Sequence, residues 1–84
     1  MTLDIFDSIF ELAQQLEAKG YGLQGEDIRD AASSSTVPSE VMLSVKSALT
    51  KAKNSIDDEI IISDIENILR KISANLRKSG FFPF

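Results

Sequence analysis

Apolar residues recur every three or four positions along four stretches of the chain, which is the spacing of one face of an α-helix. These stretches predict helices over about 3–19, 23–34, 39–53 and 57–79. No stretch alternates between apolar and polar residues at a period of two, and the connections between helices are short. Short connections favour antiparallel neighbours. The sequence therefore predicts an all-α fold, a compact antiparallel bundle of four helices in a single domain over residues 1–84.

The apolar face of each predicted helix identifies the expected core. The four faces consist of Ile5, Phe6, Ile9, Ala13 and Leu16; Leu23, Ile28, Ala31 and Ala32; Val41, Val45, Ala48, Leu49 and Ala52; and Ile61, Ile65, Ile68, Leu69, Ile72 and Leu76. Gly25 lowers the helix propensity of the second stretch, because glycine inside a helix costs about 1 kcal/mol relative to alanine.

Several polar residues and one glycine are typical of helix ends. Gly20 follows the first predicted helix and is expected in a left-handed conformation. Thr36 or Ser39 is expected to cap the third helix through its hydroxyl group. Glu66 and Arg70 have the spacing and order of a favourable ion pair along the fourth helix.

The chain contains no histidine and no cysteine. The commonest general base and the commonest ligands of structural zinc are therefore missing. Residues 20–25 match the pattern G-x-G-x-x-G, but they follow a predicted helix. A dinucleotide-binding motif would follow a strand, so we do not expect one here. We expect a protein that is not an enzyme and that binds neither a cofactor nor a metal.

The formal net charge of −4 favours a protein partner with a basic surface over nucleic acid, whose phosphates repel an acidic chain. The longest apolar run, residues 60–62, is much too short to cross a membrane. The first turn carries Asp4 and Asp7 where a secretion signal would carry basic residues. Together with the missing cysteines, these features predict a cytoplasmic protein.

Acidic residues form two groups that are candidates for binding a basic partner. The first group is Asp57, Asp58, Glu59 and Asp64, and the second is Glu26, Asp27 and Asp30. The first group also has a purely structural interpretation, because carboxylates stabilise the start of a helix. The second group is also consistent with an ordinary solvated helix face.

Some apolar residues do not fit the predicted core faces. Leu43 points about 175° away from the centre of its helix's apolar face, and Ile60 about 130°, at 100° per residue. An aromatic tail, residues 81–84, follows the fourth helix and includes Phe82 and Phe84. These residues either pack locally or contribute to a partner-binding surface.

The capping pattern resembles that of a loose group of small bacterial helical proteins. The similarity is carried by Leu16, Gly20, the run Ile28-Arg29-Asp30-Ala31, Ser34, the run Ser39-Glu40-Val41-Met42-Leu43, and Leu49. It implies a helix ending in glycine, a short second helix, a Ser/Thr-rich turn and a third helix, and no particular activity. In size, acidity and helical content the chain also resembles bacterial immunity proteins, which neutralise toxic nucleases. The tyrosine pair of the colicin-DNase immunity proteins is absent, since Tyr21 is the one tyrosine.

These features predict a non-enzymatic protein-binding module, an immunity- or antitoxin-type inhibitor that neutralises a basic toxin domain by direct binding. Two alternatives remain open. One is a self-associating structural module or homo-oligomer that uses Phe10, Leu43, Ile60 and the aromatic tail. The other is a small DNA-binding regulator that uses the third helix, with Lys46, Lys51 and Lys53.

Overall fold

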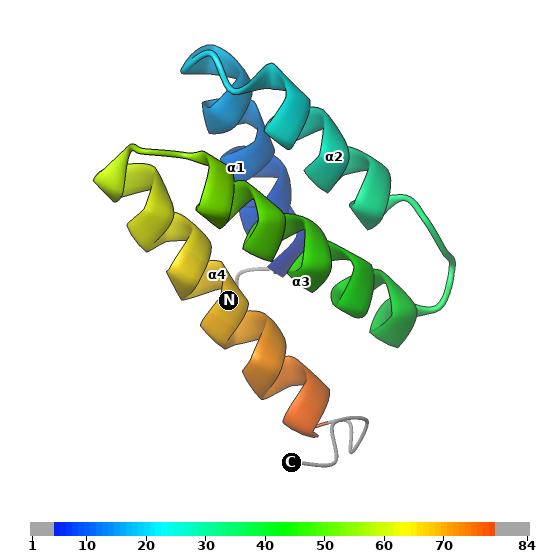
Figure 1. Cartoon of the computed structure of the whole chain (residues 1–84). Coiled ribbons are helices and arrows are strands. Elements are labelled where there is room, and N and C mark those ends of the chain that lie inside the picture. The colour runs from blue at the N-terminus through cyan, green and yellow to red at the C-terminus, as the bar shows by residue number, and fades with distance from the viewer. Residues whose placement is uncertain (1–4, 79–84) are drawn as a thin grey trace.

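The computed structural model describes residues 5–78, apart from the side chains of residues 77 and 78. The predicted aromatic tail, with Phe82 and Phe84, lies outside the described residues. Four helices follow one another along the chain (Figure 1): α1 (Ile5–Ala18), α2 (Gly22–Ala32), α3 (Pro38–Ser55) and α4 (Glu59–Lys78). The predicted all-α fold of four helices is confirmed.

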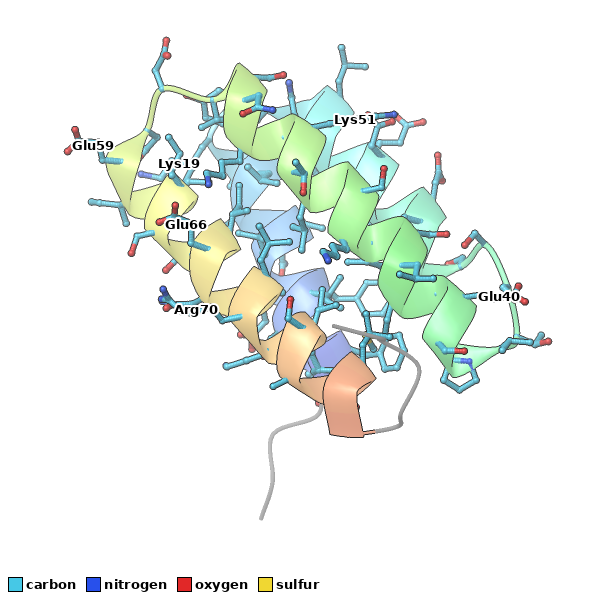
Figure 2. The ribbon with its side chains drawn as sticks, turned by 60° about the horizontal axis from the view of Figure 1, so that its bottom comes forward. Lys19, Glu40, Lys51, Glu59, Glu66 and Arg70 are labelled. Carbon is cyan, nitrogen blue, oxygen red and sulfur yellow. The ribbon has the colours of Figure 1, made fainter. Side chains whose placement is uncertain are left out.

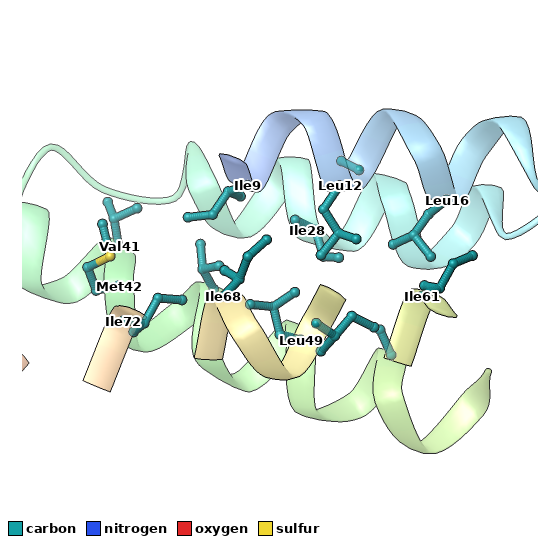
Figure 3. Packing of buried hydrophobic residues seen from close by; sticks show 14 of the residues in the cluster. Ile9, Leu12, Leu16, Ile28, Val41, Met42, Leu49, Ile61, Ile68 and Ile72 are labelled. Atoms are coloured by element: carbon teal, nitrogen blue, oxygen red, sulfur yellow. The ribbon is translucent and has the colours of Figure 1, made fainter. Parts of the chain in front are cut away.

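The helices close into a ring of contacts. Each helix packs against the next one in the chain, and α1 also packs against α4. The chain direction reverses at each connection (Figure 1), so neighbouring helices are antiparallel. Leu16, near the end of α1, lies opposite Ile61 at the start of α4 (Figure 3). The molecule measures 36 × 28 × 23 Å along its principal axes.

The predicted apolar faces of α1, α3 and α4 form the core, together with Ile28 of α2 (Figure 3). Three further residues that the helical pattern left unassigned are also buried, namely Leu12, Met42 and Ile56. Ile56 follows the last residue of α3 in an extended conformation and closes the core at the α3–α4 connection. No side chain in the described core is polar or charged.

The prediction that Leu23 belongs to the inner face of α2 is wrong, because 77% of its surface is exposed. Gly25 and Ile28 are the buried residues of this helix. Leu23 precedes Gly25 by two positions, which turns it by about 200° at 100° per residue. Because the Gly25 side of α2 contacts α1, Leu23 on the opposite side points to solvent.

The turn after α1 follows the prediction for Gly20, whose φ angle is +93°. The backbone N–H of Tyr21 donates to the carbonyl oxygen of Leu16 at 2.8 Å, and that of Gly20 donates to Glu17 at 3.4 Å. This pair of hydrogen bonds is the Schellman arrangement, which satisfies carbonyl groups at the helix end. Tyr21 then packs against the core, so the same turn ends α1 and starts α2.

The predicted caps of α3 are wrong. Val37 occupies the cap position and makes no side-chain hydrogen bond there, and Pro38 is the first helical residue. The neighbouring Ser35 orders the turn instead. Its hydroxyl oxygen accepts a hydrogen bond from the backbone N–H of Val37 at 3.0 Å, and the hydroxyl group donates to Glu40 at 3.1 Å. Proline tolerates this position because it has no N–H to satisfy.

Gly25 is required where α1 and α2 cross. A Cβ atom at this position would lie 2.8 Å from the carbonyl oxygen of Ala13 and 2.8 Å from Cγ of Glu17. Both distances are shorter than side chains tolerate, and the first contact is with backbone that cannot rotate away. The residue that weakens the helical pattern of α2 therefore allows the helix to pack closely on α1.

The predicted ion pair between Glu66 and Arg70 is not formed. Glu66 instead pairs with Lys53 of α3 at 3.1 Å, and Arg70 donates a hydrogen bond to Asn67. The contact between α3 and α4 brings Lys53 within reach of the Glu66 carboxylate, which a pattern along one helix does not reveal. Lys53, one of the three lysines considered for DNA binding, is thus engaged within the bundle.

Candidate functional site

Four residues form one exposed stripe along α2, which we call the α2 outer face: Leu23, Glu26, Asp27 and Asp30. Their spacing of i, i+3, i+4 and i+7 places them on the same side of the helix. All four are exposed to solvent, on the side turned away from the buried Gly25 and Ile28. The structure thus brings the second acidic group of the sequence together with an exposed leucine.

The three carboxylates of the α2 outer face have no ion-pair partner among the described residues. The helix dipole does not account for them either. The first turn of α2 contains no acidic residue. Asp30 lies in the last turn, where the dipole favours cations and disfavours a carboxylate. The negative charge of this face therefore adds nothing evident to the stability of the helix that carries it.

A bidentate ion pair fixes α2 on α1 beside this face. Nε of Arg29 lies 2.8 Å from Oε2 of Glu17, and Nη2 donates to Oε1 at 3.0 Å. The hydrogen bond from the Arg29 guanidinium group lowers the pKa of the Glu17 carboxyl group from its ordinary value, and the same bond raises the pKa of Arg29. The cation of α2 is thus neutralised on the flank towards α1, which leaves the outer face acidic.

The residues of the first acidic group have different surroundings in the structure. Asp58 caps α4, since its Oδ1 atom accepts hydrogen bonds from the backbone N–H groups of Ile60 at 3.0 Å and Ile61 at 3.3 Å. Asp57 and Glu59 are exposed on either side of it, and Ile60 is 75% exposed. The Asp58 carboxylate therefore has a structural task, whereas Asp57, Glu59 and Ile60 are available to a partner.

Asp64 lies apart from the helix start. It is half-buried and lines a shallow groove of about 220 Å³ between α1 and α4. Glu11, Gln15, Asn67 and Lys71 are other polar residues along this groove. The groove combines both signs of charge, so it presents no single electrostatic preference to a ligand.

The remaining predicted apolar contact residue, Leu43, is 39% exposed on α3. Phe10 is exposed to the same extent on α1, in a shallow depression lined also by Asp7, Gln14 and Arg29. Leu43 and Phe10 lie on different helices, and Phe6, one turn before Phe10, packs against the core.

The residue that sequence reasoning missed is Leu23. The sequence contains a signal for its exposure, because Ile28 and Ala32 with Gly25 define a helix face that excludes it. Hydrophobicity alone predicts the leucine in the core, whereas the close contact of Gly25 with α1 places the core on the other side of the helix.

Within residues 5–78, no group of three or more Asp or Glu residues is arranged to hold a metal ion. None of the described helices is long and apolar enough to span a membrane. Comparisons with protein-family models, with curated proteins and with solved structures find no match to this chain.

Proposed function

We propose that this chain is a non-enzymatic protein-binding module whose partner presents a basic surface. The α2 outer face carries the proposal. Three carboxylates and a leucine project from one side of a helix, and neither ion pairing nor the helix dipole explains the charges. A basic partner would neutralise these carboxylates and cover Leu23.

The energetic contribution of such a surface divides between its two kinds of residue. Exposed carboxylates accelerate encounter with a basic protein and select against acidic ones, and this effect weakens as salt is added. A leucine that becomes fully buried contributes stability to the complex once it has formed. The acidic residues therefore determine which partner binds and how fast, and Leu23 stabilises the complex against dissociation.

The class of binder that we propose is an immunity- or antitoxin-type inhibitor, which neutralises a basic toxin domain by covering its surface. Small size, net negative charge and the lack of histidine and cysteine support this class. Such an inhibitor needs no chemistry of its own, because occlusion of the toxin surface is sufficient. Among the candidate residues, we favour the α2 outer face over Asp58 as the binding surface. The Asp58 carboxylate already caps α4, whereas the carboxylates of the α2 outer face cap no helix.

The direct test uses as the binding partner any basic toxin domain that a gene neighbouring this one encodes. Calorimetry would compare the wild-type chain with the triple variant Glu26→Lys, Asp27→Lys and Asp30→Lys at two salt concentrations. We expect the variant to bind at least about tenfold more weakly at low salt, and the difference to shrink at high salt.

The control is Glu11→Lys, which reverses an exposed carboxylate of α1 along the groove between α1 and α4. We expect it to change the affinity less than about twofold, because Glu11 lies outside the α2 outer face and the proposed partner does not cover that groove. Equal affinities of the triple variant and the wild-type chain, or no binding of the basic domain, would contradict the proposal.

A further inference from the structure

Two large apolar side chains stand out from the rest of the described surface. Leu23 is 77% exposed and Ile60 is 75% exposed, whereas the next most exposed, Val37, is at 44%. Leu23 is the second residue of α2, and Ile60 is the second residue of α4. Both helices begin at the same end of the bundle (Figure 1), which is where α1 and α3 finish.

Each of these apolar residues is accompanied by exposed carboxylates. Glu26 and Asp27 follow Leu23 by three and four positions, and Asp57 and Glu59 flank the capping residue before Ile60. We call this set the α2–α4 end: Leu23, Glu26, Asp27, Asp57, Glu59 and Ile60. Two cations close to it in the chain, Arg29 and Lys53, are paired with Glu17 and Glu66. Lys19, in the turn between α1 and α2, lies at the end of the molecule where Glu59 lies (Figure 2), and Lys51 is in the penultimate turn of α3. Four exposed carboxylates against these two lysines leave the end negative.

The dimensions of the molecule allow one partner to cover the whole end. A standard protein interface buries about 800 Å² on each side, which corresponds to a patch roughly 28 Å across. The two shorter dimensions of this molecule are 28 Å and 23 Å. A single interface of ordinary size is therefore wide enough to span the end of the bundle from the start of α2 to the start of α4.

Charge decides between a second copy of this chain and a different protein. Two copies that met through their α2–α4 ends would bring the carboxylates of both into one interface, and like charges in contact are unfavourable. A protein with a basic rim around apolar pockets would instead neutralise these charges while burying Leu23 and Ile60. The occupant that fits this surface is a basic protein.

We infer that the α2–α4 end is one docking surface with two apolar anchors, Leu23 and Ile60, that together engage a single basic protein. This inference rests on the proposed function and adds the second anchor and its carboxylates, Asp57 and Glu59. Leu23 and Ile60 lie on helices that do not contact each other, so the intervening ends of α1 and α3 set their spacing. A partner must match this spacing as well as the charge.

The test places a photo-crosslinking amino acid in the full chain at position 23, 60 or 37, one position at a time, inside the source cells. We expect positions 23 and 60 to capture the same basic protein, and position 37 to capture none of it. The captured protein would be identified by mass spectrometry and purified. Its affinity is then expected to fall about tenfold for Leu23→Ser and for Ile60→Ser, and less than twofold for Val37→Ser.

Because both anchors are exposed in the free protein, circular dichroism of the serine variants is expected to match that of the wild-type chain. A basic protein that is captured from position 23 but loses no affinity with Ile60→Ser would overturn the two-anchor surface and leave the proposed function standing. Capture of an acidic protein at both positions would overturn the proposed function. The absence of any product at positions 23 and 60 would overturn the inference.

Discussion

Gly25 shows how one residue can weaken a helix and still be required by the fold. Its lack of a side chain lets the α2 backbone approach the carbonyl oxygen of Ala13, where a Cβ atom would lie at 2.8 Å. We expect Gly25→Ala to lower the free energy of unfolding by about 1–2 kcal/mol, because overpacking outweighs the gain of about 1 kcal/mol in helix propensity. Chemical denaturation measures this difference.

Gly22 provides the matched control in the same helix. A Cβ atom there meets no atom within 4 Å. Gly22→Ala is therefore expected to leave the stability unchanged or to raise it by up to about 0.5 kcal/mol. An equal effect of the two substitutions would show that close packing is not the reason for glycine at position 25.

The side chain of Asp58 stabilises the start of α4. Its carboxylate accepts two backbone hydrogen bonds at the start of α4. We expect Asp58→Ala to lower the free energy of unfolding by about 1 kcal/mol, a typical cost of losing a helix cap. Asp57→Ala, one residue earlier and exposed, is expected to change it by less than about 0.5 kcal/mol. Equal losses in the two variants would refute the capping assignment.

Among the elements, α1 and α2 are joined by the ion pair of Glu17 and Arg29, which makes their packing depend on pH. The pKa of Glu17 is lowered in the folded protein from an ordinary value of 4.5, chiefly by its hydrogen bond with Arg29. A lowered pKa stabilises the folded state above the unfolded pKa, and this stability is lost as the pH falls through the folded pKa.

We therefore expect the wild-type chain to be more stable than Glu17→Gln at pH 7, and the difference to vanish on acidification from about pH 4.5 downwards. Urea denaturation between pH 7 and pH 3 measures this. Glu11→Gln, which alters an exposed carboxylate on the same helix, is expected to show a smaller dependence. A stability difference for Glu17→Gln that persists at pH 3 would show that the charge of Glu17 is not its source.

The elements also show how far a sequence pattern reaches. The faces of α1, α3 and α4 were predictable because many apolar residues repeat there and one misplaced residue cannot alter the average. In α2 the helix is short and its contact face includes a glycine, so the apolar pattern predicts the wrong side of the helix for Leu23. The partner of Glu66 was unpredictable for another reason, because Lys53 comes from a different helix and is brought close only by packing.

At the scale of the whole molecule, the antiparallel order of the helices decides which surface residues can act together. Residues that are far apart in the sequence, such as Leu23 and Ile60, reach the same end because α2 and α4 start there (Figure 1). Hydrophobicity identified Ile60 as unusual, and charge identified both acidic groups. Their common location required the fold, since no local pattern states which helix starts coincide.

We claim that a basic protein binds through the α2 outer face. Backbone amide NMR shifts of the ¹⁵N-labelled full chain, recorded during titration with a basic toxin domain, locate the residues that such a protein contacts. We expect the largest changes in residues 22–30, with a second set near the start of α4, and weaker binding as salt is raised. Changes confined to the groove between α1 and α4, or to the surroundings of Leu43, would contradict the claim.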